Sequence, residues 1–352
     1  MPAHITRPAS VLPRHKVSTQ EILDDIRSHH ADHPRLGAIL RIVAGVGVDT
    51  RYFCHPLDSP VVAGDAGITE RAESAFADAL RMGQDAALLA LDTAGIGPGD
   101  VDALITSHST SWAVPGLDVH LTNRLGLPPG VRRFAMTTLA CGGGVQALIR
   151  AAELACARPG SKVLVVVSEV ISAVYNHRQD SMQSMIYKAL FGDSAAACVV
   201  STERHGPGLT VEHPVGSDST LELLLPDTTD RYRGRIDERG LHFDSTKAAK
   251  KAADASMPHL RDWLSGASPD FAVIHPGSPV IIDDVATGLG LAPADTRHSR
   301  ELLAEEGNRG GPSILGILER FHNTPPADGD SGVAVAFSPG FAVSALRGTW
   351  RN

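Results

Sequence analysis

The chain has 352 residues, 43% of them hydrophobic and 20% charged, which is typical of a soluble globular protein with a large core. Its formal net charge of −8 provides no basic excess to neutralise phosphates, which argues against a nucleic-acid partner. The four cysteines form no C-x-x-C pair and no apolar run reaches membrane-spanning length, so we expect a cytoplasmic protein without a cysteine–zinc site or a membrane partner.

Short apolar segments alternate with helical patterns along the chain. Continuous apolarity that ends in Gly, Pro or Ser indicates strands covered on both faces. The alternation predicts an α/β architecture with buried sheets. The strand-like segments are 101–109, 162–170, 195–200, 270–278 and 332–340, and the helical patterns are 69–95, 142–157, 246–266 and 311–321.

A faint internal repeat relates two parts of the chain. The similar segments DALITSHST and DFAVIHPGS begin at Asp102 and Asp270. Cys141 follows the first start by 39 residues, and Asn308 follows the second by 38. Because glycine and a helical pattern follow both residues, we expect two duplicated halves in which Cys141 and Asn308 occupy equivalent helix starts.

Cys141 lies where a strand-like segment turns into a helix, in TTLACGGGVQALIRAAELA (137–155). Free amides and the helix dipole favour an anion there, so we expect the pKa of this thiol to lie below its usual range. The three glycines that follow would allow close approach of a substrate or of neighbouring backbone. The alternative is a small buried residue at a tight strand–helix junction.

His275 and Asn308 are two further candidates for thiol chemistry. His275 ends the strand-like segment FAVIH, and strand ends are where α/β proteins usually place their sites. Asn308 precedes a helical pattern, so it is either an N-cap or a hydrogen-bond donor in a site. Histidine keeps a thiol ionised, and the two side chains together would stabilise a developing oxyanion.

The chain resembles a type III polyketide synthase, of the chalcone-synthase-like branch of the thiolase superfamily. The likeness runs from about Arg35 to Leu346 in matching order and spacing. It is carried by ACGGG at Cys141, ALFGDSAAACVV (189–200), HPGSPVIID (275–283), GNRGGPS (307–313) and FSPGFAV (337–343).

The resemblance implies a homodimer of five-layered αβαβα thiolase-like subunits with two halves, 1–218 with the cysteine and 219–352 with the histidine and asparagine. It implies decarboxylative Claisen condensation, in which thiolate Cys141, paired with protonated His275, takes an acyl group from a thioester starter. His275 and Asn308 would then hold malonyl-CoA while CO2 leaves. No metal or redox cofactor is implied, because loss of the carboxylate supplies the driving force, and the implied substrates are acyl-CoA and malonyl-CoA.

Residues that resemble the family's pocket are Phe191 and Phe243, as gatekeeper aromatics or else ordinary core. Ser338 replaces a glycine of the closing loop, and Thr110 and Trp112 fall on another cavity-wall segment. From Ser338, Thr110 and Trp112 we expect a small cavity that allows one to three condensations.

Basic residues that would grip CoA are sparse in segment 35–52. Arg41 matches one of them, but Ala38 and Gly45 stand where lysines are common, so an acyl carrier protein is an alternative source of the starter. A ketoacyl synthase III-like enzyme that condenses once is the nearest rival function. An acyltransferase without condensation and a silent thioester-binding partner are the others.

Overall fold

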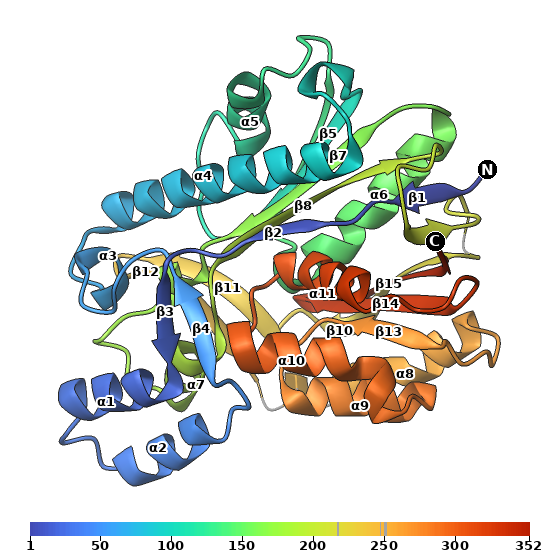
Figure 1. Cartoon of the computed structure of the whole chain (residues 1–352). Helices are drawn as coiled ribbons and strands as arrows, with labels where there is room; N and C mark the ends of the chain where they lie inside the picture. Colours follow the sequence, from blue (N-terminus) through green and yellow to red (C-terminus); the bar gives the residue numbers. More distant parts are fainter. Residues whose placement is uncertain (217, 247, 250–251) are drawn as a thin grey trace.

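The computed structural model describes residues 1–216, 218–246, 248–249 and 252–352, arranged in five layers (Figure 1). Among these residues, eleven strands form one mixed sheet in the order β13-β14-β15-β9-β1-β8-β7-β5-β6, with β10 on β15 and β2 on β8. The strands are β1 (Ala3–Ile5), β2 (Ala9–Val11), β5 (Ala103–His108), β6 (Arg132–Thr137), β7 (Val163–Glu169), β8 (Ser194–Ser201), β9 (Gly208–Val211), β10 (Thr220–Thr228), β13 (Phe271–Ile274), β14 (Ser331–Ser338) and β15 (Gly340–Arg351).

Strand β9 joins the two halves, because it pairs with β1 on one side and with β15 on the other. The strands of each half then diverge and enclose a helical layer between them (Figure 1). This arrangement is the predicted αβαβα fold, with the N-terminal strands in one β layer and the C-terminal strands in the other.

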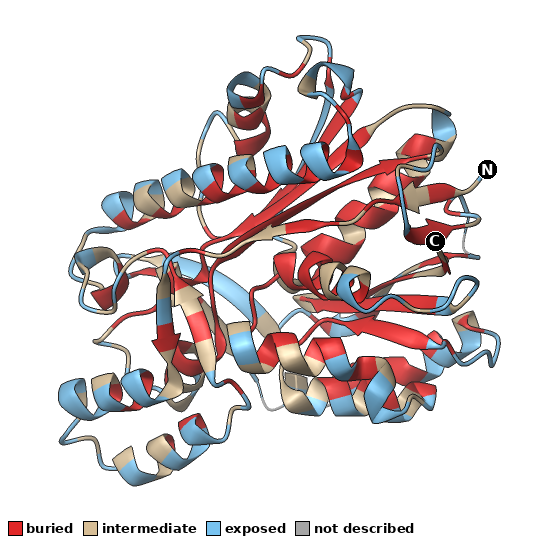
Figure 2. Cartoon of the chain, in the orientation of Figure 1, coloured by how far each residue is buried: buried red, intermediate tan, exposed pale blue. Residues whose placement is uncertain are grey.

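The middle layer consists of α6 (Gly143–Ala157) and α11 (Pro312–Asn323), which pack on each other and on strands of both halves. Both helices are buried along most of their length, as Figure 2 shows, because apolar side chains occupy nearly every face. Their core includes Val145 and Ile149 of α6, Ile314 and Ile317 of α11, and Val273 of β13.

Outer helices cover the two exposed sheet faces. Helix α4 (Ile68–Ala94) buries a stripe of alanines, Ala75 to Ala90, on the N-terminal strands and leaves its other face to solvent (Figure 2). Of the described helices, none is long and apolar enough to cross a membrane. The other covering helices are α5 (Leu117–Leu125) on the N-terminal half and α8 (Ala252–Trp263), α9 (Pro279–Leu289) and α10 (Arg297–Glu306) on the C-terminal half.

A group of shorter helices and strand pairs lies to one side of the five layers (Figure 1). Helices α1 and α2 contact α7, and α7 in turn contacts β12. The elements are α1 (Thr19–His29), α2 (Leu36–Ala44), α3 (Pro60–Ala63), α7 (Met182–Leu190) and the antiparallel pairs β3 (His15–Ser18) with β4 (Thr50–Phe53) and β11 (Tyr232–Asp237) with β12 (Gly240–Ser245). Short 3₁₀ turns are η1 (Pro98–Asp100), η2 (Ala140–Gly142), η3 (Ile171–Val174) and η5 (Pro293–Thr296).

The sequence-based elements recur within a few residues of their expected bounds, with two differences. The segment 270–278 is a strand only to Ile274, because Ser278 already caps helix α9 by accepting a hydrogen bond from the amide of Ile281. Residues 247, 250 and 251 of the predicted helix 246–266 lie outside the described residues, and α8 runs from Ala252 to Trp263.

Candidate active site

Cys141 lies in the turn between strand β6 and helix α6, as predicted. Thr138 and Ala140 adopt positive φ angles of 62° and 47°, which bend the chain sharply enough to place Cys141 within η2, two residues before α6 begins. Non-glycine residues seldom take such angles. The sharp turn therefore directs a thiol toward the start of the middle-layer helix.

The three glycines after Cys141 are required by close neighbours. A side chain at any of them would collide with an atom of another segment, so the glycines serve packing within the protein. The contact at the third glycine joins the first turns of α6 and α11. Gly142 faces the side chain of Ser338, Gly143 faces that of Ser107, and Gly144 faces the carbonyl oxygen of Gly311.

Asn308 is held rigidly by backbone hydrogen bonds just before α11. Its amide donates to the carbonyl of Leu190 (2.8 Å), and its carbonyl accepts from the amide of Gly192 (3.0 Å). Its side-chain Oδ1 accepts from the amide of Gly310 (2.9 Å), which leaves the amino group Nδ2 as the donor for a partner. The N-cap alternative is wrong, because Gly311 caps α11 and makes no side-chain cap bond.

The Asn308 side chain reaches the thiol. Burial raises the pKa of Cys141 to about 12, and the hydrogen bond from Asn308 acts in the opposite direction. The expected pKa below the usual range is therefore wrong for this arrangement. Surrounding protein removes the water that would solvate a thiolate, and this effect exceeds that of the hydrogen bond from Asn308.

His275 follows strand β13 and is 2% exposed. Its backbone amide donates to the carbonyl of Val335 (2.8 Å), which holds it beside strand β14. Among the described residues, neither ring nitrogen has a hydrogen-bond partner. Burial lowers the pKa of His275 to about 3, so the imidazole is neutral at pH 7. Buried polar atoms without partners are uncommon and mark this ring as available to a ligand.

Glu169 is a cavity residue that the sequence analysis missed. It ends strand β7 and lines the same small cavity as Cys141. Its Oε2 accepts a hydrogen bond from the amide of Ser109 (3.0 Å), while Oε1 has no partner among the described residues. Burial raises the pKa of Glu169 to about 7. A polar residue ending an apolar strand was the available signal, the same one that identified His275.

Aromatic rings form one wall of the cavity. Phe191 stacks on Tyr187 with centroids 5.0 Å apart and meets Phe243 edge-on at 6.1 Å. Phe243 in turn stacks on Tyr232, across the β11–β12 hairpin. Phe191, Phe243 and Tyr232 line the cavity, so the two predicted aromatics lie together beside the thiol. The remaining volume is about 10 Å³, which holds about one water molecule.

Of the other predicted pocket residues, one lines the cavity and three do not. Thr110 lines the cavity, and its hydroxyl accepts a hydrogen bond from the amide of Val170 (2.9 Å). Ser338 lies beneath the cysteine turn, against Gly142, and does not line this cavity. Arg41 is exposed on α2 and does not line this cavity. Trp112 is 78% exposed, so its expected place in the cavity wall is wrong for this chain.

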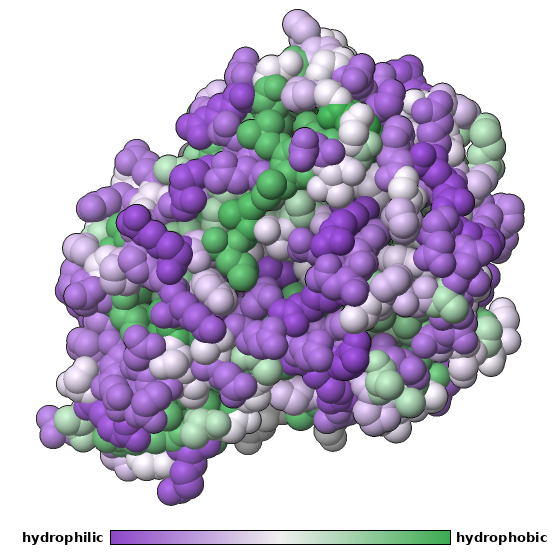
Figure 3. All heavy atoms as spheres, viewed as in Figure 1, coloured by the Kyte–Doolittle hydropathy of each residue, from purple (hydrophilic) through white to green (hydrophobic). Residues whose placement is uncertain are grey.

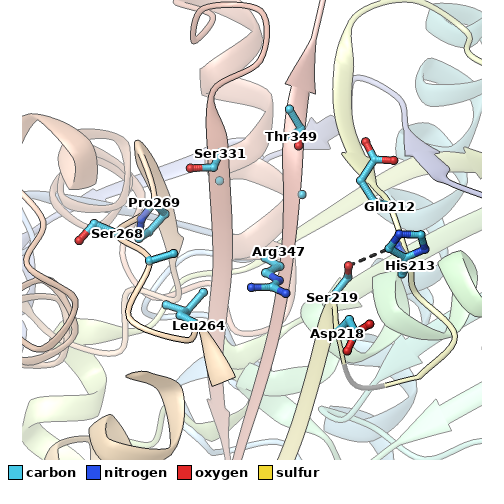
Figure 4. A pocket seen from close by; sticks show the side chains of 13 residues that line it. Glu212, His213, Asp218, Ser219, Leu264, Ser268, Pro269, Ser331, Arg347 and Thr349 are labelled. Carbon is cyan, nitrogen blue, oxygen red and sulfur yellow. Dashed lines mark hydrogen bonds between the residues drawn. The ribbon is translucent and has the colours of Figure 1, made fainter. Parts of the chain in front are cut away.

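A larger cavity of about 330 Å³ lies elsewhere, between β15 and the segments that precede β10 and β13 (Figure 4). Its lining combines the guanidinium of Arg347 with the carboxylates of Glu212 and Asp218. It contains none of the three predicted catalytic residues, whereas Cys141 lines the small cavity and His275 and Asn308 do not. The reactive thiol in its lining, and not its size, therefore identifies the small cavity at Cys141 as the candidate active site.

Comparison with known families decides what this site belongs to. Residues 56–204 match the model of the N-terminal domain of chalcone and stilbene synthases, and residues 218–347 match that of the C-terminal domain. The chain belongs to the chalcone and stilbene synthase family. It is a type III polyketide synthase, an acyltransferase that performs decarboxylative condensation, as the resemblance implied.

Relatives agree over nearly the full length. The 1,3,6,8-tetrahydroxynaphthalene synthase of Streptomyces griseus is 30% identical over 99% of this chain and 93% of its own. The phloroglucinol synthase of Pseudomonas fluorescens is 29% identical over 97% and 98%. Among solved structures, the tetrahydroxynaphthalene synthase of Streptomyces coelicolor superposes with a TM-score of 0.93 at 28% identity, covering 99% of both chains. Germicidin synthase of the same organism gives 0.91 at 30% identity, covering 99% and 100%.

The raised pKa of Glu169 predicts a pH-dependent stability. The folded protein holds this proton up to about pH 7, whereas the unfolded chain releases it near the ordinary value of 4.5. Stability is therefore lost as pH rises through this window, by up to about 3 kcal/mol. Glu169→Gln removes the titration. We expect urea unfolding to show that, between pH 4.5 and pH 8, the free energy of unfolding of Glu169→Gln rises by this amount relative to that of wild type. The same difference between variant and wild type at both pH values would contradict the assignment.

Proposed function

We propose that this synthase loads a short acyl group onto Cys141 and extends it with malonyl-CoA, with His275 and Asn308 holding the malonyl thioester. The observation that supports this most directly is the orientation of Asn308. Its Oδ1 is engaged by Gly310, so its amino group is the part that meets the thiol. A donor aimed at the reacting sulfur also serves the oxygen of a thioester bound there.

Acylation begins with transfer of the thiol proton to His275. Each group alone resists charge, because burial raises the pKa of Cys141 to about 12 and lowers that of His275 to about 3. Transfer between them would create two opposite charges and leave the net charge of the site unchanged. Mutual attraction in a poorly solvated cavity offsets much of the desolvation penalty. The thiolate then attacks the starter carbonyl, and the CoA or carrier thiol leaves.

Extension uses the same donors a second time. With the acyl group on Cys141, the imidazole and the Asn308 amino group bind the carbonyl oxygen of malonyl-CoA. The bond to the carboxylate breaks, its electron pair forms an enolate, and CO2 departs. The two hydrogen bonds stabilise the enolate oxygen. Its carbon then attacks the Cys141 thioester, and the sulfur leaves as thiolate. This sequence requires no redox or metal chemistry.

The aromatic wall supports a short product. A volume of about 10 Å³ leaves room for a growing chain only as far as Phe243 and Tyr232 turn aside, so these two rings would limit its length. We propose one to three condensations on a small starter. The rival ketoacyl synthase III-like function would stop after one condensation, so product length distinguishes the two.

The low positive charge around α2 supports keeping two candidate sources of the starter. Arg41 is the basic residue in the last turn of this helix, and the flanking residues Ala38 and Gly45 add no charge. Binding of an acyl-carrier protein to the enzyme depends less on contacts with the phosphates of CoA than binding of free acyl-CoA does. We therefore retain acyl-carrier protein beside acyl-CoA as the starter donor, with malonyl-CoA as the extender.

We further propose a cytoplasmic homodimer of subunits that divide after residue 218. The four cysteines are unpaired, which fits a reducing compartment. Strand β6 is an edge of the sheet, and it exposes Phe134. Apolar residues also gather over α4, which carries exposed Leu88 and Leu89 (Figure 3). An unpaired strand edge and an exposed apolar surface each suit contact with a second copy.

The central test separates loading from decarboxylation. Asn308→Ala should acquire an acyl adduct on Cys141 yet release CO2 from malonyl-CoA about 100- to 1,000-fold more slowly, because one oxyanion donor is lost. Cys141→Ala should show no adduct. Intact-mass spectrometry with acyl-CoA and acyl-carrier protein in parallel measures loading, and Asn123→Ala, an exposed asparagine of α5, is the matched control. Unchanged CO2 release in Asn308→Ala would refute the role.

The proton transfer predicts how Cys141 reacts with iodoacetamide. In His275→Gln the thiol stands alone with its raised pKa, so alkylation should increase about tenfold per pH unit with no plateau below pH 10. The thiol of the wild-type protein should be alkylated faster at pH 7 than that of His275→Gln, and its rate should change less with pH. Superimposable pH profiles would show that the imidazole does not accept the proton.

The aromatic wall predicts a change in product length. Phe243→Ala removes a ring beside the thiol and should shift the products toward additional condensations, as measured by mass spectrometry of reaction mixtures. Ile236→Ala changes an exposed residue of the same hairpin and serves as the control. Products of unchanged length from a folded, active Phe243→Ala would contradict the proposed size limit.

A further inference from the structure

A second group of reactive side chains lies outside the catalytic cavity, where helix α1 meets the segment that leads into α7. Asp25 and His29 are one helical turn apart on α1, and His177 comes from the connection between η3 and α7. One potential ligand atom of each residue lies within 4.8 Å of the other two. The condensation reaction uses none of these three side chains.

The two imidazoles converge on one carboxylate oxygen. Asp25 Oδ1 lies 3.3 Å from His29 Nδ1 and 3.1 Å from His177 Nε2. The rings stack with centroids 3.7 Å apart and planes inclined by 22°. His177 Nε2 is buried but lacks the alignment of a hydrogen bond among the described residues. In the tautomer that carries its proton on Nδ1, His177 would present the lone pair of Nε2 to a cation bound beside the carboxylate.

We propose that Asp25, His29 and His177 bind a divalent transition-metal cation of the zinc class. Two imidazole nitrogens and one carboxylate oxygen form a ligand set that zinc accepts, with bonds of about 2.0–2.2 Å. Ligands at that radius lie within about 4 Å of one another, so binding requires the partly exposed ring of His29 to turn out of its stack on His177 until both nitrogens face the ion. Binding replaces the contact of His29 Nδ1 with the carbonyl of Asp25 (3.0 Å).

The surroundings supply both orientation and access. The Tyr175 hydroxyl donates a hydrogen bond to Asp25 Oδ2 (2.6 Å). This bond holds the carboxylate in place and leaves Oδ1 for the metal. Such outer-shell bonds commonly tune metal affinity. The His29 side chain is 40% exposed, so the ion enters from solvent and keeps a position for water.

The metal would act as a clamp between sequence-distant segments. It ties α1 to the chain that enters α7, where Tyr187 stacks on the cavity residue Phe191. Binding free energy is then available only to the folded protein, which it stabilises. The proposal does not depend on the condensation mechanism, because no ligand lines the cavity at Cys141.

Titration calorimetry with zinc chloride on EDTA-treated, dialysed full-length protein tests the site. We expect one zinc ion per chain, with the dissociation constant increased at least about tenfold by His29→Ala and by His177→Ala. His29→Ala is a partly exposed change that should leave folding intact, even if His177→Ala unfolds. Tyr175→Phe should retain one equivalent with weaker binding.

Two control variants separate this site from zinc binding at a surface histidine or at the catalytic thiol. His259→Ala, an exposed histidine on α8, and Cys141→Ala should both bind zinc as wild type does. Absence of stoichiometric zinc binding by wild type would overturn the proposal. So would affinity unchanged in His29→Ala, or affinity lost in Cys141→Ala, which would locate the metal at the catalytic thiol.

Discussion

Two helices begin side by side in the middle layer, and their contact determines the geometry of the site. Gly144 in the first turn of α6 lies against the carbonyl oxygen of Gly311, which precedes α11. Cys141 and Asn308 each lie three residues before the two contacting glycines. Without this close approach, the carboxamide of one half of the chain would not reach the thiol of the other. Backbone packing between the two halves thus brings their equivalent helix starts, and with them Cys141 and Asn308, together.

The same packing excludes water, with consequences for every titratable group nearby. Burial moves the pKa of Cys141 and Glu169 upward and that of His275 downward, so each neutral form is favoured. A charge is stable there only beside an opposite one or under a set of donors. Reaction steps that shift a proton or an electron pair between neighbours fit such a cavity, and free ions do not.

The central strands and the equivalent places of Cys141 and Asn308 were predictable from the sequence, because they depend on local pattern. Continuous apolar segments indicated the central strands, and the repeated glycine-then-helix pattern indicated equivalent places for Cys141 and Asn308. The pKa of the thiol was not predictable, because it depends on how much protein surrounds the sulfur. Glu169 gave too little local signal to be singled out.

Trp112 and Arg41 show the limit of family likeness, since a motif position does not determine which way a loop or helix face turns. The pair His29 and His177 shows a different limit. These residues are far apart in the chain, and no spacing rule relates them. Only the packing of α1 against the segment before α7 brings their rings together.

The most direct test of this account is Gly144→Ala. The added methyl group collides with the carbonyl of Gly311 and should separate the two helix starts, whereas Gly130→Ala adds a methyl group into open space. Single-turnover loading of Cys141 and CO2 release from malonyl-CoA, measured on variants with cooperative unfolding, should both fall at least about a hundredfold in Gly144→Ala and remain unchanged in Gly130→Ala. Wild-type rates in a stably folded Gly144→Ala would contradict the claim that this contact aligns the thiol with the carboxamide.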